Sequence, residues 1–499
     1  MMKLSPAKCV LPYLWLFVVI CSLCAAPSIS PGATAAPTEP SSTEEAAAGP
    51  STVVGRIGTY VITKKELEDR LMTELHPYDQ EFYGQNARPP DAMTVLMKMV
   101  AEKAMIMEAR KQTYLQDEMI SASIKRYRDR RLVNLLVQKY VEKNRGKTAA
   151  TEDEIKQKMQ ADPKLDKDRA KAEIERARAG RLLDEYYKQI YTKSRAKKLN
   201  QYFPRAVEVH QRLLHRPKAP RKVPWMQTSQ VRDELAPSEA NMVLALYSGG
   251  KITLKDWLTA YCDIVPPRRP KIDTPAAVDE LLERAMSMPL LVWEAKSLGL
   301  DKDQDFVKQV REYEDRRLLG EVQLARQKEL TEPMPEELTA YFNENKEAFG
   351  TSEKLKIDLI WCEDLPTARK VKAELESGRD FEAVREQYSL EKKGKAFQTQ
   401  PGSEGLFWKD LWAGEPGRIL GPLKGFYGRG MKWRIVKILE KTPGQPKEYS
   451  SQMDSQIKDR MMTERRKQAI AMYGQELLRK YPFQVYPDRV KEIDPLEIP

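Results

Sequence analysis

The sequence predicts a mainly α-helical protein made of two copies of one helical core, with one small α+β domain inserted into the second copy. Three observations support this fold class. A strand-turn-strand-helix pattern occurs twice, long stretches carry apolar residues at helical spacing, and roughly a hundred residues of mixed strand and helix pattern interrupt the second copy. At 499 residues, the chain is too long for one hydrophobic core.

The N-terminal segment has the pattern of an export signal. Lys3 and Lys8 precede an apolar run, and Ala33-Thr34-Ala35 places small residues at the spacing of a cleavage site. We therefore expect a signal peptide at 1–35, with an uncleaved membrane anchor as the alternative. Residues 36–51 are rich in Pro, Ala, Ser, Thr and Glu, which predicts a disordered spacer.

Charge and cysteine content exclude several classes of protein. The net charge is +11, but Lys and Arg alternate with Glu and Asp along the helical stretches, so we expect no nucleic-acid partner. Beyond the signal only Cys262 and Cys362 remain, too few for a disulfide framework or a metal cluster. We expect buried free thiols and no metal or cofactor; a disulfide between the two cysteines is the alternative.

The first mark of the internal repeat is a short hairpin that leads into a helix. Residues 53–63 end in Thr63, an expected N-cap with Glu66 as its reciprocal acid. Residues 243–253 repeat this design, with Asp256 in the place of the glutamate.

Two further motifs recur at one constant separation. Glu108-Ala109-Arg110 matches Glu294-Ala295-Lys296, and the six residues from Tyr127 match the six from Tyr313. Both matches are 186 residues apart, so no gap separates them.

Each copy is expected to close with a long amphipathic helix, at 168–203 in the first copy and 450–480 in the second. The predicted domains are copy one at 52–215, a linker rich in Pro and basic residues at 216–240, and copy two at 241–350 and 443–499.

The pattern of the insert, residues 351–442, predicts a strand, two helices, a Gly-rich turn and a final pair of strands. The first strand is expected at 355–361 and the first helix at 366–377, ended by Gly378. The second helix is expected at 382–389 and a short one at 409–413.

These motifs resemble the SurA, PrsA and PpiD family of foldases, whose chaperone core is interrupted by a parvulin (PpiC-type) peptidyl-prolyl isomerase domain. Gly378-Arg379-Asp380-Phe381 and the turn from Gly402 to Trp408 are similar to that domain's motifs. The resemblance implies a SurA-like N-terminal chaperone domain in each copy, a location in the periplasm or cell envelope, and unfolded or nascent exported polypeptides as partners. Membrane contact is expected only through an uncleaved N-terminus.

The resemblance also implies histidines on the first and last strands of the parvulin-like domain, but Asp358 and Arg434 stand there, and no histidine follows His215. We therefore expect isomerase activity to be absent, and we hypothesise an ion pair between Asp358 and Arg434. The residues that resemble an apolar pocket lining are Phe407, Trp408, Leu411, Trp412 and Trp433.

The sequence thus predicts an exported folding chaperone that binds unfolded chains. Its parvulin-like domain is expected to be inactive. Two alternatives remain at this point, an active prolyl isomerase and a structural or partner-specific envelope assembly protein. The sequence identifies neither the clients nor the oligomeric state.

Overall fold

The structure is a computed structural model that describes residues 51–76, 88–214, 225–428 and 430–498. The predicted signal peptide and nearly all of the predicted spacer lie outside these residues. Among the described residues, no helix combines the length and the apolarity that crossing a membrane requires. The fold is mainly α-helical with small antiparallel sheets, as the sequence predicts.

The described chain divides into two compact units. Unit 1 contains residues 116–316, and unit 2 contains residues 51–115 together with 317–498. Along the sequence, unit 1 therefore lies inside unit 2. This division differs from the predicted domains, because each unit combines segments of both predicted copies.

Unit 2 contains a three-stranded sheet covered by helices. Its strands are β1 (Val53–Ile57), β2 (Tyr60–Thr63) and β10 (Phe483–Val485), in the order β10-β1-β2. The helices outside the insert are α2 (Lys64–Leu75), α3 (Ala92–Lys111), α14 (Pro335–Glu344), α19 (Asp454–Lys480) and α20 (Pro487–Lys491). Apolar residues from β1, β2, α2, α3, α19 and α20 form one core.

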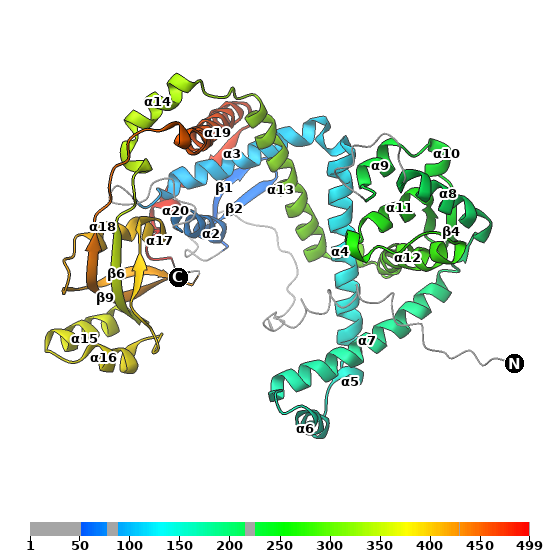
Figure 1. Ribbon diagram of the computed structural model, residues 1–499, viewed down its shortest axis with the longest axis horizontal. Coiled ribbons are helices and arrows are strands. Elements are labelled where there is room, and N and C mark those ends of the chain that lie inside the picture. The colour runs from blue at the N-terminus through cyan, green and yellow to red at the C-terminus, as the bar shows by residue number, and fades with distance from the viewer. Residues whose placement is uncertain (1–50, 77–87, 215–224, 429, 499) are drawn as a thin grey trace, which may run out of the picture. The chain divides into compact units, whose positions relative to one another are not determined.

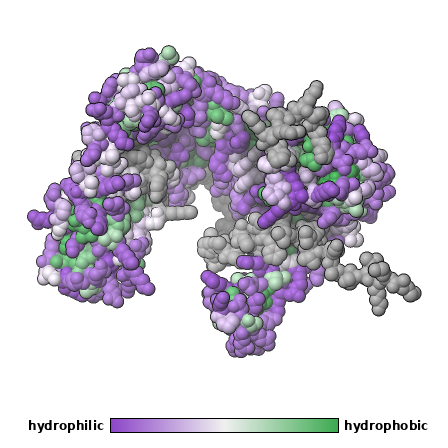
Figure 2. Space-filling view, in the orientation of Figure 1, coloured by the Kyte–Doolittle hydropathy of each residue, from purple (hydrophilic) through white to green (hydrophobic). Residues whose placement is uncertain are grey.

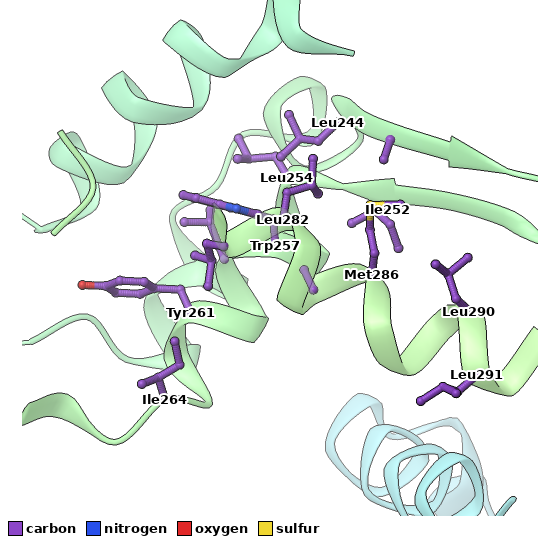
Figure 3. Close-up of a cluster of buried hydrophobic side chains, with 14 of the residues drawn as sticks. Leu244, Ile252, Leu254, Trp257, Tyr261, Ile264, Leu282, Met286, Leu290 and Leu291 are labelled. Carbon is purple, nitrogen blue, oxygen red and sulfur yellow. The ribbon is translucent and has the colours of Figure 1, made fainter. Parts of the chain in front are cut away.

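Unit 1 has its own three-stranded sheet and core. The strands are β3 (Lys197–Lys198), β4 (Val243–Tyr247) and β5 (Gly250–Thr253), in the order β3-β4-β5. The helices are α4 (Glu118–Lys143), α5 (Arg145–Thr148), α6 (Glu152–Ala161), α7 (Lys167–Lys193), α8 (Phe203–Leu214), α9 (Thr228–Asp233), α10 (Pro237–Ala240), α11 (Leu254–Cys262), α12 (Pro275–Ser297) and α13 (Gln304–Lys328), which continues into unit 2. Figure 3 shows Leu244 and Ile252 of the hairpin meeting Trp257 of α11 and Leu282 and Met286 of α12.

The two hairpins have the same register. In β1–β2, Gly55 pairs with Ile62 after a bulge that follows Val53, and in β4–β5, Ala245 pairs with Ile252 after a bulge that follows Val243. Both lead directly into a helix with the expected capping box, Thr63 with Glu66 and Thr253 with Asp256. Because these side chains satisfy the first free N–H groups of the helix, the short motifs fix where α2 and α11 begin.

Each hairpin sheet is completed by a strand from the other predicted copy. β1 pairs with β10, which follows α19, whereas β4 pairs with β3, which follows α7. The helices follow the same exchange, because α19 joins the unit 2 core and α7 the unit 1 core. Either returning helix presents an apolar face to a similar hairpin, so the repeat pattern alone could not specify which pairing forms.

Two other expectations need correction. The helix predicted at 168–203 ends at Lys193, because Arg195 adopts a left-handed conformation (φ 52°) and the chain then extends into β3. The linker predicted at 216–240 contains α9 and α10, and Met226, Val231 and Leu235 are buried in the unit 1 core. Residues 215–224 lie outside the described chain.

The insert forms a four-stranded antiparallel sheet with helices (Figure 1). The strands are β6 (Lys354–Cys362), β7 (Phe397–Thr399), β8 (Ile419–Tyr427) and β9 (Gly430–Thr442), in the order β7-β6-β9-β8. The helices are α15 (Leu365–Glu376), α16 (Phe381–Tyr388), α17 (Pro401–Glu404) and α18 (Trp408–Trp412). The ends of the insert meet where Thr351 N–H donates to the Gln445 carbonyl at 2.8 Å.

Two helix ends of the insert are fixed by local contacts, and Gly378 ends the first helix as the sequence predicts. Asp380 caps α16 by accepting the Ala383 N–H at 3.0 Å. Gly378 follows α15 with φ 93°, and its N–H donates to the Leu375 carbonyl while the next N–H, from Arg379, donates to the Glu374 carbonyl. This pair of bonds is a Schellman motif, which needs a residue that tolerates the left-handed conformation.

Candidate functional site

A hollow of about 400 Å³ opens beside β6, β7 and β9 of the insert, and we call it the sheet hollow. Four large apolar side chains line it: Leu359, Trp361, Phe397 and Phe426. The other lining residues are Asp358, Glu391, Gly394, Lys395, Gln398, Thr399, Ser403, Glu404 and Arg434. On the face shown in Figure 2, hydrophobic residues gather over β6 and β9 within a mostly hydrophilic surface.

A buried ion pair lies in the wall of the sheet hollow. Arg434 of β9 and Glu404 of α17 are 2% and 6% exposed, and Arg434 Nη2 donates to Glu404 Oε2 at 2.7 Å. The other oxygen of Glu404 accepts from the Thr399 hydroxyl at 2.7 Å. The guanidinium carbon of Arg434 lies 5.3 Å from the centre of the Trp361 ring. A buried carboxylate held by two donors cannot move freely, so Glu404 acts as a fixed anchor for Arg434.

The second ion pair contradicts the pairing hypothesised from the sequence. Asp358 contacts Arg385 of α16, a residue only 1% exposed, whereas Arg434 pairs with Glu404. Arg385 also donates to the Glu382 carboxylate at 2.7 Å and to the Gly394 carbonyl at 2.8 Å. Asp358 and Arg434 therefore line one hollow without bonding each other. Asp358 and Arg434 each have a counterion of their own. No sequence motif identified Arg385 or Glu404 as these counterions.

The five residues expected to form the pocket lie around the hollow rather than in it. Trp408 and Leu411 are fully buried in the core on one face of the sheet, and Trp408 Nε1 donates to Glu353 at 2.7 Å. Trp412 stacks on Trp408 with ring centres 5.5 Å apart. Phe407 packs edge-on against Phe426 at 5.1 Å, so it supports a lining residue. Trp433 packs against the core on the side of α15 and α16.

The apolar lining itself was not identified from the sequence. Leu359 and Trp361 alternate along β6, and that period of two was a usable signal for one face of a strand. Phe397 belongs to β7, a strand of three residues that no pattern predicted. Phe426 lies near the end of β8, where its neighbours in sequence are mostly half-buried.

Two acidic residues that line the sheet hollow are held in ion pairs, Asp358 by Arg385 and Glu404 by Arg434. Burial raises the pKa of the nearby Cys362 thiol to about 11, so it is protonated at neutral pH. Arg434 Nε is buried and has no hydrogen-bond partner among the described residues.

The described residues contain no cluster of His, Cys, Asp or Glu that could hold a metal ion. Cys262 and Cys362 are free thiols, the first half-buried and the second buried.

Comparison with known proteins finds matches only among solved structures. No family model matches the chain, and no curated protein matches it. One match is a SurA-like chaperone of Campylobacter jejuni, at 15% identity and a TM-score of 0.24, covering 49% of this chain and 100% of that one.

The foldase protein PrsA of Streptococcus pneumoniae matches at 16% identity and a TM-score of 0.24, over 38% of this chain and 73% of that one. A PrsA peptidylprolyl isomerase of Bacillus anthracis matches at 15% identity and a TM-score of 0.22, over 56% of this chain and 96% of that one.

Proposed function

We propose that the protein is an exported folding chaperone that binds unfolded envelope or secreted polypeptides, and that its parvulin-like domain binds chains without isomerising them. The observation that carries this proposal is the sheet hollow. It combines exposed apolar surface with two ion pairs whose charges are already neutralised inside the protein.

The apolar rim is what a chain-binding site requires. Phe397 is 45% exposed on the rim of the sheet hollow, a large fraction for an aromatic side chain. Covering such a ring with a client side chain would gain about 25 cal/mol for each Å² of apolar surface removed from water.

Isomerase catalysis needs contacts that are stronger in the twisted amide than in the planar one, across an intrinsic barrier of roughly 18–20 kcal/mol. Asp358 and Arg434 stand where the resemblance places the histidines, and both are committed to ion pairs. We therefore expect no acceleration of proline-limited refolding of a test protein. Acceleration that disappears when residues 353–444 are replaced by a two-glycine join would instead establish an active isomerase.

The binding half of the proposal is tested with a permanently unfolded probe, reduced and carboxymethylated α-lactalbumin, by fluorescence anisotropy with the mature chain. We expect Phe397→Asp to weaken binding, because it places a charge on the apolar rim. The matched control is Met472→Asp on α19, which is 70% exposed and does not line the hollow. Equal affinities for the wild type and both variants would remove the sheet hollow from the binding surface.

A further inference from the structure

A second hollow, of about 600 Å³, lies beside the hairpin sheet of unit 1, and we call it the hairpin hollow. Five of its lining residues are apolar or aromatic: Leu199, Tyr202, Met242, Val243 and Leu246. Tyr202 and Leu246 are 40% and 44% exposed. The remaining lining residues are Arg205, Ser238, Glu239 and Asn241.

Unit 2 contains a matching position, which can be compared with the hairpin hollow. In unit 1 the Leu199 N–H donates to the Leu244 carbonyl at 2.9 Å, and in unit 2 the Tyr486 N–H donates to the Val54 carbonyl at 3.0 Å. By this match, Arg489 stands where unit 1 has Tyr202.

In unit 2 the chain covers the matching place with its own side chains. Arg489 Nη1 donates to the Val53 carbonyl at 2.7 Å, and its guanidinium carbon lies 4.5 Å from the centre of the Tyr486 ring. The position is therefore occupied by a charged side chain that is hydrogen-bonded within unit 2.

The hairpins also differ in polarity, with apolar residues in unit 1 where unit 2 has polar ones. Leu246 of β4 has Arg56 as its counterpart in β1, and Met242 just before β4 has Thr52. Because the two hairpins share one register, the fold does not require apolar residues at these positions. Unit 1 exposes a leucine and a tyrosine together at these positions, whereas on the matching face of unit 2 the exposed apolar side chain is Val61, which pairs with Arg56.

The charged residues that line the hairpin hollow are paired with one another or with their neighbours. Glu239, 9% exposed, accepts from Arg205 at 3.0 Å and from Arg212 at 2.6 Å, and Arg205 also pairs with Glu208 at 2.7 Å. Two exposed lysines, Lys197 and Lys251, pair with Leu246 from either side on the same face of the sheet. The surface therefore favours an apolar group from a segment without basic residues.

We infer that the hairpin hollow binds an uncharged apolar side chain of an extended, unfolded polypeptide, and so is a second client-binding site, separate from the parvulin-like domain. The inference rests on the proposed chaperone function. It adds a site on the helical part of the protein, with the chemical class of segment that this site accepts.

The experiment uses the mature full chain and a fluorescein-labelled 13-residue peptide of Gly, Ser and Thr with one central benzoylphenylalanine. Anisotropy measures its affinity, and irradiation followed by mass spectrometry locates the cross-link. We expect cross-links to residues 199–205 or 238–246 of the protein. Leu246→Arg combined with Met242→Thr, which copies the chemistry of unit 2, should weaken binding about tenfold, the effect of losing one buried apolar contact.

The matched control is Leu298→Arg, which adds the same charge at a 54% exposed leucine that does not line the hollow. It should leave the affinity unchanged, and thermal unfolding should show that all variants are folded. Cross-links that avoid both 199–205 and 238–246, or equal affinities for the wild type and the double variant, would overturn the inference. If the chain still binds carboxymethylated α-lactalbumin in that case, only this inference fails; if it binds neither probe, the proposed function fails as well.

Discussion

Glu108 and Glu294 occupy matched positions in the two copies, and each holds the end of a returning helix. Glu108 Oε2 accepts from Lys480 Nζ at 2.8 Å and from the Tyr481 hydroxyl at 2.6 Å. Glu294, 5% exposed, accepts from Lys193 Nζ at 2.7 Å. The sequence marked both only as the start of a repeated Glu-Ala-basic motif. The contacts explain the motif, because each glutamate anchors a helix that arrives from the other copy.

Replacing Glu108 should weaken unit 2 in a pH-dependent way. The hydrogen bond from Lys480 holds the pKa of the Glu108 carboxyl below its ordinary value. A lowered pKa contributes stability above the carboxyl's unfolded pKa, and that contribution is lost as the pH falls through the folded pKa. We expect Glu108→Gln to lower the free energy of unfolding by about 1 kcal/mol at pH 7, and by less at pH 4, in urea titrations.

The control for this change is Glu476→Gln, an exposed glutamate on the same returning helix α19. It should change the unfolding free energy little at either pH. A Glu108→Gln effect that stays constant from pH 7 to pH 4 would contradict the role given to the charged carboxylate.

The two cysteines should react slowly with thiol reagents in the native protein. Burial raises the pKa of both Cys262 and Cys362 to about 11, so at pH 8 only about 0.1% of each thiol is ionised, against roughly a tenth to a quarter for an ordinary cysteine. Reaction of the mature chain with Ellman's reagent should be slow at pH 8 and release two thiols promptly in guanidinium chloride. Fewer than two thiols there would reveal a disulfide instead.

At the scale of elements, local signals in the sequence were sufficient where a few neighbouring residues decide the structure. The capping boxes at Thr63 and Thr253 and the glycine at 378 each fix a helix end through contacts within five residues. Partners distant in sequence could not be predicted in this way. The counterions Arg385 and Glu404 and the short strand β7 depend on tertiary packing, which no local pattern encodes.

The exchange of returning helices between the two copies is the largest difference from the sequence prediction at this scale. One contact in unit 1 joins matched residues of the two copies. Tyr127 of α4 stacks on Tyr313 of α13, its own counterpart 186 residues later, with ring centres 3.9 Å apart and planes within 2°. A residue that meets its own equivalent is typical of a two-fold symmetric contact between identical subunits. Here the repeat places that contact inside one chain.

Deleting residues 483–499 tests the exchange directly. The deletion removes β10, which pairs with β1, and leaves β3, which pairs with β4. Hydrogen exchange should therefore accelerate at the amides of 53–57 while those of 243–247 keep their protection. Loss of protection at 243–247 instead would show that the second hairpin depends on the C-terminal segment, as the sequence first suggested.

At the scale of the whole molecule, each of the two units contains one of the proposed client-binding sites. Unit 1 has its own core and the hairpin hollow, and unit 2 has the sheet hollow in the insert. Because Thr351 and Gln445 are bonded to each other, the ends of the insert are already together, and its removal need not disturb α14 or α19. The insert is thus an addition to a protein whose helical part we expect to bind clients itself.

The most direct test of that central claim is light scattering from two unrelated, aggregating proteins, with the mature chain and with the variant in which two glycines replace residues 353–444. We predict that the mature chain suppresses the aggregation of both proteins at near-stoichiometric amounts, and that the variant retains a measurable part of this suppression. Aggregation of both proteins that proceeds unchanged in the presence of the mature chain, or suppression limited to one of them, would contradict a general chaperone and favour a partner-specific assembly protein.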